Sequence, residues 1–349
     1  MRAVVVHGPE DLRIDEVADP IAGPGQVVIA MEWGGICGSD LSYYKHGASG
    51  TAVLKHPLVL GHEIAGRIVQ VGAGVTNLSL GDAVTVHPSQ PVGGAPLPDR
   101  LAGRTNLYPE IRYFGSAAFD PHTDGGFSEL RAVDAGMIRL LPSGVDTLSG
   151  ALAEPFAVAL HAVNRAGDVR GRDVLVNGAG PIGSLVVAAL KYRGAATVTA
   201  ADIQDSALAI AEELGATTTV NVAAGGVLPT DTELVFETSG ASGALGSVLR
   251  ATARGGTLVQ VGNLPGTPTP AALGDLVTRE ITWIGSYRFV DEIDDALEAM
   301  AGGVDLSPIV THRFDLADAG AAMQVAADRR AGSSKVMLRL GASDSSPLR

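Results

Sequence analysis

The sequence predicts an α/β protein in which a β-rich domain is followed by a doubly wound parallel sheet. The chain has 349 residues, more than twice the roughly 150 residues common for one domain. Residues 1–154 contain short runs rich in Val and Ile that Gly and Pro interrupt, and from residue 155 strand-like and helix-like patterns alternate. Such alternation is typical of a parallel sheet with helices on both faces.

The β-rich part begins at the first residues. Its expected strands are residues 3–6, 26–31, 64–71 and 83–86. Turn-forming sequences such as Gly23-Pro24-Gly25 separate them, and short strands of this kind predict a small barrel or sandwich. Residues 88–110 form a Pro- and Gly-rich loop without a clear period, which is longer than compact domains usually contain.

The second part alternates strand and helix. Its expected elements are strands at 173–177, 197–202, 233–237, 256–261 and 281–286, with helices at 181–193 and 205–214. The patterns that follow no longer fit a parallel sheet, so we expect the end of the chain to return to the first domain. They are helices at 291–301 and 316–327 and a strand at 335–340. The expected domains are therefore 1–154, 155–288 and the return at 289–349, with a frayed tail after Gly341.

A Gly-rich turn follows the first strand of the second part. The pattern G-x-G-x-x-G is formed by Gly178, Gly180 and Gly183, with Pro181 and Ile182 between the last two. In this pattern the first Gly permits a tight turn, the second lets the backbone approach a pyrophosphate, and the third lets the helix lie close to the sheet. The helix N-terminus adds N–H donors and positive potential, so the turn predicts a dinucleotide site.

An acidic residue ends the next strand. Asp202 occupies the position at which a carboxylate usually accepts hydrogen bonds from the adenosine ribose. The residues that follow it, 203–206, include Asp205 and no Arg, so a 2′-phosphate would meet two carboxylates and no cation. The sequence therefore predicts NAD rather than NADP. A Gly-rich turn that binds nothing is the alternative, and the joint presence of strand, turn, helix and acid disfavours it.

Potential zinc ligands occur on separate segments. They are Cys37 in GGICGSD, His62 and Glu63 in LGHE, and Glu154 in AEP. A thiolate, an imidazole and a carboxylate that leave one position open describe a catalytic zinc site rather than a structural one. Spacing alone does not separate this hypothesis from a buried cysteine and an ordinary His-Glu pair. Because Cys37 is the only cysteine, an intrachain disulfide and a four-cysteine zinc site are excluded.

Composition excludes several classes of function. The chain has 25 basic and 38 acidic residues, a formal charge of −13, and no Lys/Arg block, so nucleic acid is not expected as a partner. No uninterrupted apolar stretch approaches the roughly 18 residues of a membrane span. The first residues lack the basic, apolar and small-residue regions of a secretory leader, so a cytoplasmic protein is expected.

The segments GGICGSD, LGHE, EP and GAGPIG, in this order, make the chain similar to the zinc-dependent medium-chain dehydrogenase/reductase family over nearly its whole length. Within this family the polyol branch, which includes the sorbitol dehydrogenases, is the most similar group. The stretches that most resemble the L-idonate dehydrogenases of that branch are 34–44, 87–91, 112–117, 121–127, 154–162 and 285–289. The resemblance implies a GroES-like β-barrel catalytic domain, a Rossmann domain, and an active site in the cleft between them.

The resemblance also implies roles for individual residues. Cys37 and His62 would bind zinc, with either Glu63 or Glu154 as the third protein ligand. Ser39 would hydrogen-bond the substrate oxygen and pass on its proton. Asp40 would orient the histidine ligand, although a helix N-cap is an equally compatible role.

Further residues are implied on the substrate and cofactor sides. The substrate side comprises Tyr43, Phe114 and Arg288. Arg288 could bind a sugar-acid carboxylate or serve the cofactor, and the sequence leaves both open. The residues implied near the nicotinamide are Val261, Gly262 and Asn263, with Ser286 and Arg288 on the cofactor side.

Two departures from the family pattern matter. Many relatives carry a second, structural zinc on four cysteines, whereas the corresponding positions here are Val92, Ala95, Pro98 and Asn106. One zinc per chain is therefore expected. Relatives often have a histidine five residues after the zinc cysteine, in the proton relay, and here that position is Ser42.

The function expected from these features is zinc- and NAD-dependent oxidation of a secondary hydroxyl in a sugar acid or polyol. Alternatives are the same chemistry on sorbitol, xylitol, threonine or a simple alcohol, and a catalytically silent NAD-binding protein of this fold. Retention of the potential metal ligands argues against a silent protein. A homo-oligomer, most often a tetramer in the polyol branch, is expected to pair through edge strands near 281–286.

Overall fold

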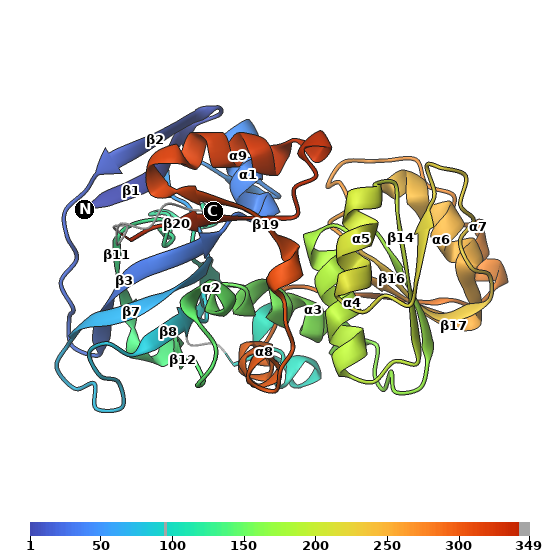
Figure 1. Ribbon diagram of the computed structural model, residues 1–349, viewed down its shortest axis with the longest axis horizontal. Coiled ribbons are helices and arrows are strands. Elements are labelled where there is room, and N and C mark those ends of the chain that lie inside the picture. Colours follow the sequence, from blue (N-terminus) through green and yellow to red (C-terminus); the bar gives the residue numbers. More distant parts are fainter. Residues whose placement is uncertain (94–95, 342–349) are drawn as a thin grey trace. The chain divides into compact units, whose positions relative to one another are not determined.

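The computed structural model describes residues 1–93 and 96–341, which divide into two compact units. Unit 1 combines Met1–Glu154 with the C-terminal segment that begins at Val310, and unit 2 is Pro155–Ile309. The predicted fraying after Gly341 lies outside the described residues, and so does Ala95 of the Pro/Gly-rich loop. Figure 1 shows the strand-rich unit 1 and the helix-flanked sheet of unit 2.

A seven-stranded sheet forms the framework of unit 1. Its path is β12-β8-β7-β3-β20-β19, and β11 pairs with β3 off this path. The strands are β3 (Gln26–Gly35), β7 (Glu63–Val71), β8 (Ala83–Val86), β11 (Leu130–Asp134), β12 (Ile138–Leu140), β19 (Val310–Asp315) and β20 (Lys335–Arg339). Because β20 pairs directly with β3, the C-terminal segment lies beside the strand that leads to Cys37 (Figure 1).

Smaller elements complete unit 1. The short sheets contain β1 (Arg2–Gly8), β2 (Asp11–Glu16) and β6 (Leu58–Val59); β4 (Ala48–Ser49) and β5 (Ala52–Val53); β9 (Ser89–Pro91) and β10 (Ile111–Tyr113). The α-helices are α1 (Gly38–His46), α2 (Thr147–Gly150) and α9 (Ala319–Ala327). The 3-10 turns are Asp99–Leu101, Thr105–Leu107, Ala135–Met137, Leu316–Asp318 and Arg329–Ala331.

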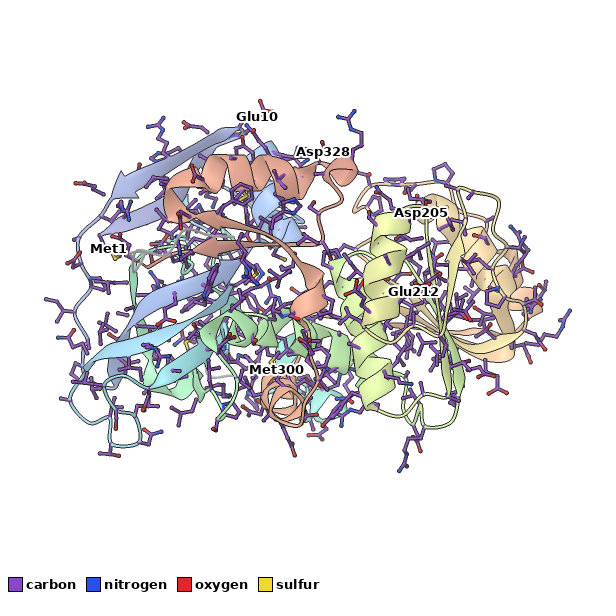
Figure 2. All side chains as sticks on the ribbon, in the orientation of Figure 1. Met1, Glu10, Asp205, Glu212, Met300 and Asp328 are labelled. Carbon is purple, nitrogen blue, oxygen red and sulfur yellow. The ribbon has the colours of Figure 1, made fainter. Side chains whose placement is uncertain are left out.

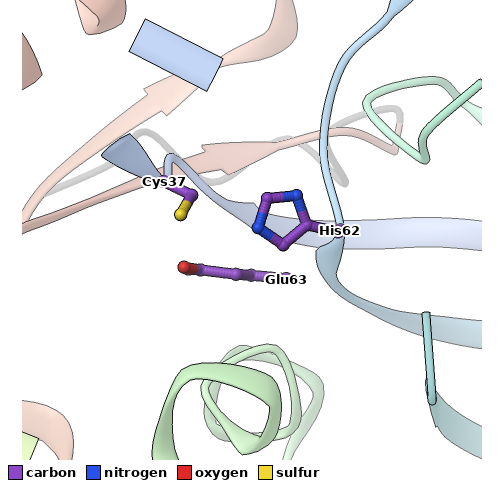
Figure 3. Close-up of side chains that lie close together, drawn as sticks. All are labelled: Cys37, His62 and Glu63. Carbon is purple, nitrogen blue, oxygen red and sulfur yellow. The ribbon is translucent and has the colours of Figure 1, made fainter. Parts of the chain in front are cut away.

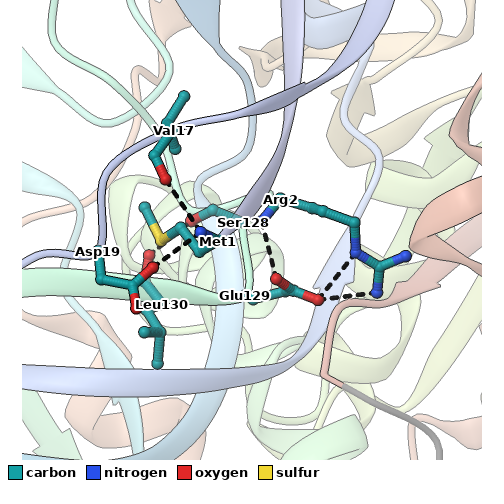
Figure 4. Close-up of polar contacts among 7 residues, drawn as sticks. All are labelled: Met1, Arg2, Val17, Asp19, Ser128, Glu129 and Leu130. Atoms are coloured by element: carbon teal, nitrogen blue, oxygen red, sulfur yellow. Dashed lines mark hydrogen bonds and ion pairs between the residues drawn. The ribbon is translucent and has the colours of Figure 1, made fainter.

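Polar contacts tie the N-terminus to unit 1 (Figure 4). The ammonium group of Met1 donates to the carbonyl of Val17 at 2.9 Å and to Asp19 at 2.7 Å. The guanidinium of Arg2 pairs with Glu129 at 2.7 Å, and the Arg2 N–H donates to the same carboxylate. Exposed pairs of this kind add little free energy, so their effect is mainly to fix β1 against the segment that precedes β11.

The side chain of Phe127 is fully buried against Gly34 and Gly61, on the two segments that lead to Cys37 and His62. A Cβ atom at Gly34 would lie 2.7 Å from Phe127 Cε1, and one at Gly61 would lie 2.1 Å from Phe127 Cδ1. Gly61 also has a φ of +97°, which side-chain-bearing residues rarely adopt. Since Gly61 precedes His62, this packing fixes the point at which β7 starts.

Unit 2 is a six-stranded parallel sheet of order β15-β14-β13-β16-β17-β18, which confirms the predicted doubly wound fold. Its strands are β13 (Asp173–Asn177), β14 (Thr197–Asp202), β15 (Thr218–Asn221), β16 (Thr232–Glu237), β17 (Thr252–Gln260) and β18 (Thr282–Gly285). Its helices are α3 (Ala153–Arg165, which starts in unit 1), α4 (Pro181–Tyr192), α5 (Asp205–Glu213), α6 (Leu245–Ala251), α7 (Gly274–Thr278) and α8 (Glu292–Ala301), with 3-10 turns at Ser242–Ala244 and Ser307–Ile309. Within the described residues, no helix has both the length and the apolar character needed to cross a membrane.

Side-chain hydrogen bonds attach α5 to the neighbouring edge strand. Figure 2 labels Asp205 and Glu212 on this helix. Asn221 donates to Asp205 at 2.6 Å, and Thr219 donates to Glu212 at 2.8 Å. Both donors belong to β15, so the helix is held along the strand that follows it in the chain.

The division of the chain differs from expectation at one point. The return to the first domain is expected from the sequence at residue 289, whereas in the structure α8 belongs to unit 2 and the chain joins unit 1 only from Val310. The reason is packing and charge, because Ile293 of α8 is fully buried and Asp295 pairs with Arg193 of the same unit at 2.5 Å. The sequence of an amphipathic acidic helix shows that one face is apolar, but it does not show which of the two units that face packs against.

Gly61→Ala tests the packing under Phe127. We expect a loss of about 2–4 kcal/mol in the free energy of unfolding, because the new methyl group overlaps the ring and the backbone is strained. Thermal and denaturant unfolding followed by circular dichroism measures the loss. The matched control is Gly74→Ala, where φ is +84° but nothing lies within 4 Å of the new Cβ. Equal losses in the two variants would contradict the role given to Phe127.

Candidate active site

Cys37, His62 and Glu63 bring three potential metal-ligand atoms within 4.8 Å of one another. Cys37 is the N-cap residue of α1, just after β3, while His62 directly precedes β7 and Glu63 begins it. In the antiparallel β3–β7 pair, Gly35 lies opposite Glu63, so the end of one strand meets the start of the other. Figure 3 shows the sulfur, the ring and the carboxylate gathered around one space.

His62 supplies the nitrogen donor of this cluster. Its side chain is 6% exposed, and its Nδ1 atom is buried with no hydrogen-bond partner among the described residues. Figure 3 shows that the other ring nitrogen, Nε2, faces the Cys37 sulfur and the Glu63 carboxylate, so Nε2 is the donor available to a metal in this space. Burial lowers the pKa of His62, but the adjacent Cys37, Asp40 and Glu154 raise it to about 10. A nitrogen, a sulfur and an oxygen donor amid acidic groups fit zinc.

Asp40 links the two segments that carry the potential ligands. Its buried carboxylate accepts the N–H of Cys37 at 2.9 Å and the N–H of Gly61 at 3.2 Å. The first bond belongs to a capping box at the start of α1. Burial raises the pKa of this carboxyl group. Asp40 is therefore not the N-cap, which is Cys37, but the N3 residue of the capping box, and it also bridges to the residue before His62.

A buried ion pair holds Glu63. Lys335 Nζ lies 2.8 Å from Oε1 and 2.7 Å from Oε2 of Glu63, and donates to the carbonyl of Ile36 at 3.3 Å. The two residues are 1% and 2% exposed. Burial lowers the pKa of Lys335, but the nearby Glu63, Cys37 and Glu154 together outweigh this effect and raise it. Lys335 is not among the residues predicted from the sequence, although a lysine that opens the apolar run KVML is a signal for a buried charge.

Glu154 has a different environment. It lies at the start of α3, and the Tyr113 hydroxyl donates to its Oε1 at 2.5 Å. Burial raises the pKa of this carboxyl group. Of the two glutamates that the sequence left open, Glu63 alone joins Cys37 and His62 in the cluster found among the described residues. Tyr113, which also stands 5.5 Å from the His62 ring, was missed at the sequence level.

The other predicted residues of unit 1 lie in or near its core. Ser39 is half-buried in the first turn of α1, and Ser42 is half-buried one turn later. Tyr43 is buried, and its hydroxyl accepts the N–H of Ala117 at 2.9 Å. Phe114 is buried beneath the guanidinium of Arg131, which lies 5.2 Å from the ring centre. Tyr43 and Phe114 therefore shape the segment 114–117.

The Gly-rich turn of unit 2 lies between β13 and α4. Gly178 has a φ of +97°, and a Cβ atom at Gly183 would lie 1.8 Å from the Gly178 carbonyl oxygen. Gly180 is the N-cap of α4, with nothing within 4 Å of a Cβ built there, and Pro181 and Ile182 follow it in the first turn. The helix N-terminus is consequently open to a ligand, as a pyrophosphate site requires.

Asp202 lies at the end of β14, beside the Gly-rich turn. Its Oδ2 accepts the N–H of Ala179 at 2.6 Å, and its Oδ1 accepts the N–H groups of Ile203 at 2.7 Å and Gln204 at 3.0 Å. The carboxylate therefore sits beside the Gly-rich turn, which places a predicted ribose acceptor next to a predicted phosphate donor set.

The remaining predicted cofactor residues follow β17 and β18. The N–H groups of Val261 and Gly262 both donate to the Glu237 carbonyl at 2.9 Å, and Asn263 comes next. Ser286 donates its N–H to Gln260 at 2.9 Å, while its hydroxyl is buried with no partner among the described residues. The Arg288 guanidinium stacks on the Tyr287 ring at 4.9 Å. The predicted residues of unit 2 thus gather at the carboxyl ends of the parallel strands, where such sheets bind ligands.

The lobe that holds a second zinc in many relatives is irregular here. Pro98 precedes a 3-10 turn, Asn106 is buried in the next one, and Val92 hydrogen-bonds to Glu110 at 2.9 Å. Among residues 1–93 and 96–341, the only group of His, Cys, Asp and Glu side chains close enough to hold a metal is the one at Cys37.

Comparisons with known proteins agree with this geometry. The family model for the alcohol dehydrogenase GroES-like domain matches residues 23–143, and the model for zinc-binding dehydrogenases matches residues 181–302. The chain is 36% identical to sorbitol dehydrogenase from Bos taurus, covering 99% of this chain and 98% of that protein. It is 35% identical to L-idonate 5-dehydrogenase (NAD(P)(+)) from Escherichia coli strain K12, covering 94% and 96%.

Solved structures give the same result. The crystal structure of L-idonate 5-dehydrogenase from Escherichia coli matches with a TM-score of 0.90 and 32% identity, covering 97% of each chain. That of 2R,3R-butanediol dehydrogenase from Bacillus subtilis matches with a TM-score of 0.83 and 30% identity, covering 97% of this chain and 99% of the other. The expected family is confirmed: the chain belongs to the zinc-dependent medium-chain dehydrogenase/reductase family, whose members use a nicotinamide dinucleotide to oxidise CH–OH groups.

Proposed function

We propose that the protein oxidises a secondary hydroxyl of a sugar acid, with L-idonate as substrate and 5-keto-D-gluconate as product. The observation that carries the chemistry is the cluster of Cys37, His62 and Glu63, whose sulfur, nitrogen and oxygen donors lie within 4.8 Å of one another. The substrate rests on similarity to the Escherichia coli enzyme named for L-idonate. Polyol oxidation is the second candidate, because relatives named sorbitol dehydrogenase are similar to the same extent.

Cys37, His62 and Glu63 are the residues we assign to one zinc ion per chain. Zinc held by these residues would supply a Lewis acid that lowers the pKa of a substrate hydroxyl, and NAD would supply the hydride acceptor. Lys335 holds Glu63 by contacting both of its carboxylate oxygens. Asp40 fixes the spacing of the two ligand segments through their backbone N–H groups.

The proton of the substrate hydroxyl needs an acceptor. Ser39 is our candidate, because it lies two residues after Cys37 on the first turn of α1 and is partly exposed. Ser42, one turn further along, stands where relatives often have histidine, so the relay would continue through a hydroxyl instead of an imidazole. Glu154 is kept in place by Tyr113 and serves as an additional acidic group beside His62.

For the cofactor we propose NAD at the carboxyl ends of the unit 2 sheet. The open N-terminus of α4 supplies N–H donors for the pyrophosphate, and Asp202 supplies the acceptor for the ribose. The two carboxylates at Asp202 and Asp205 would repel a 2′-phosphate. Val261, Gly262, Asn263 and Ser286 are assigned to the nicotinamide end.

Cys37→Ser tests the metal site. Wild-type protein is expected to contain one zinc per chain by elemental analysis, and the variant almost none, because thiolate is the ligand at this site that zinc binds most strongly. Turnover should fall by about a hundredfold or more. NAD binding should persist, since Cys37 is remote in sequence from the dinucleotide turn. A zinc content of two per chain in wild type, or full activity of the variant after chelation, would contradict the assignment.

A substrate and cofactor panel tests the proposed reaction. We expect kcat/KM for L-idonate to exceed that for sorbitol by about tenfold or more, and NAD to be preferred over NADP by a similar factor. Arg288→Ala should lose much of its activity on L-idonate and little on sorbitol if Arg288 binds the carboxylate. Equal activity of the wild type on both substrates would contradict the proposed preference for a sugar acid and favour a general polyol dehydrogenase.

A homo-oligomer, most simply a tetramer, is proposed from the open edge of the unit 2 sheet. β18 is the terminal strand of that sheet, and Trp283 on it is only half-buried. Pairing of two such edges across a two-fold axis would cover exposed backbone groups. Sedimentation at micromolar concentration should therefore give a multiple of the 35.5 kDa chain mass. A monomer under these conditions would be the contrary result.

A further inference from the structure

Glu237 carries a buried carboxylate that neither the metal site nor the Gly-rich pattern explains. It ends β16 and is fully buried. Its Oε1 accepts from the Asn177 amide at 3.3 Å, the Ser239 N–H at 3.0 Å and the Ser239 hydroxyl. Its Oε2 accepts from the Gly240 N–H at 3.2 Å and the Gln260 amide at 2.6 Å. All five donors are neutral groups, so the buried charge depends on their arrangement.

The donors at Ser239 and Gly240 form a turn that is packed against the predicted cofactor residues. A Cβ atom at Gly178 would lie 2.7 Å from the Ser239 nitrogen, and one at Gly262 would lie 2.3 Å from the Gly240 nitrogen. A Cβ atom at Gly240 would in turn lie 2.5 Å from the Asn263 carbonyl oxygen. Any shift of this turn is therefore transmitted both to the Gly-rich turn and to the segment after β17.

Gln260 makes the second connection. Its Nε2 donates to the Glu237 carboxylate and also to the Gly262 carbonyl at 2.8 Å, while its Oε1 is buried with no partner among the described residues. The orientation of this amide is consequently set by Glu237. Gly262 lies in the segment assigned to the nicotinamide end of the cofactor.

We infer that Glu237 is a positioning residue for dinucleotide binding: its carboxylate holds the 239–240 turn and the Gln260 amide, and through them the Gly178 turn and Gly262. The inference rests on the proposed cofactor site at these strand ends. Glu237 does not need to touch the cofactor, because it acts by fixing backbone groups that do.

The chemistry of a glutamine substitution makes this inference testable. Glu237→Gln keeps the shape of the side chain but replaces one acceptor oxygen by an NH2 donor. When the oxygen of the new amide takes the place of Oε1, it faces Asn177 and Ser239. The NH2 group then takes the place of Oε2 and faces the donors at Gly240 and Gln260. Gln260 can accept from it only by turning its own amide around, which leaves the Gly262 carbonyl without its donor.

Calorimetric titration with NAD and with ADP-ribose, which lacks the nicotinamide, measures the effect. Glu237→Gln is expected to weaken binding of both by about tenfold, because both depend on the Gly178 turn. Gln260→Met removes the amide at similar side-chain length. It is expected to weaken NAD by about fivefold and ADP-ribose by less, because Gln260 contacts Gly262 directly but reaches the 239–240 turn only through Glu237, which keeps its other donors.

Thr252→Ala is the matched control. Thr252 is fully buried at the amino end of β17, where its hydroxyl donates to Val248 at 2.9 Å. The variant should lower Tm and leave both affinities unchanged. Wild-type NAD affinity in Gln260→Met, or in a folded Glu237→Gln protein, would overturn the inference, as would an equal loss in Thr252→Ala. Failure of the wild type to bind NAD would instead overturn the cofactor site, and the inference with it.

Discussion

The buried ion pair between Glu63 and Lys335 requires the two ends of unit 1 to come together. Lys335 opens β20, and β20 pairs with β3 so that Met337 lies opposite Gly35, one strand away from Glu63. Removing one member of a buried pair typically costs about 3–5 kcal/mol, because the remaining charge stays desolvated. The C-terminal segment cannot leave the sheet without imposing this cost on Glu63. The return of the chain to unit 1 is thus coupled directly to the candidate metal site.

The charges around this pair explain why the cluster suits a cation. Asp40, Glu63 and Glu154 are all buried near His62, and within the described residues Lys335 is the one lysine or arginine that forms an ion pair with any of them. Burial raises the pKa of both Asp40 and Glu154, because each negative charge is held away from water. A divalent ion at the cluster would offset this charge. Metal binding and the stability of unit 1 are therefore expected to be linked.

The sequence was sufficient for the parts of the fold that depend on local pattern. The strand–helix alternation of unit 2, the turn at Gly178 and the acid at Asp202 are set by periodicity and turn chemistry over short distances. The choice between Glu63 and Glu154 depends instead on the register of β3 against β7, which no local pattern encodes.

Buried charges outside the known motifs were also missed, because burial is a property of the assembled sheet. Lys335 is one of four lysines in the chain and begins an apolar strand, which is a usable signal. Glu237 follows the apolar run LVF, and nothing in the local sequence distinguishes it from an exposed acid at the end of a strand. Its five donors come from three different segments, and only the pairing of β16 with β13 and β17 brings them together.

The chain compensates its two most buried glutamates in different ways, and the difference matches what each site has to do. Glu63 is balanced by the flexible ammonium of Lys335, an interaction that depends mainly on charge and tolerates small movements of the carboxylate. Glu237 is balanced by neutral donors in fixed turns, an arrangement that tolerates little movement because each donor has its own direction. A ligand that must adjust to a metal is suited to the first arrangement. Backbone turns that must present N–H and carbonyl groups to a rigid dinucleotide are suited to the second.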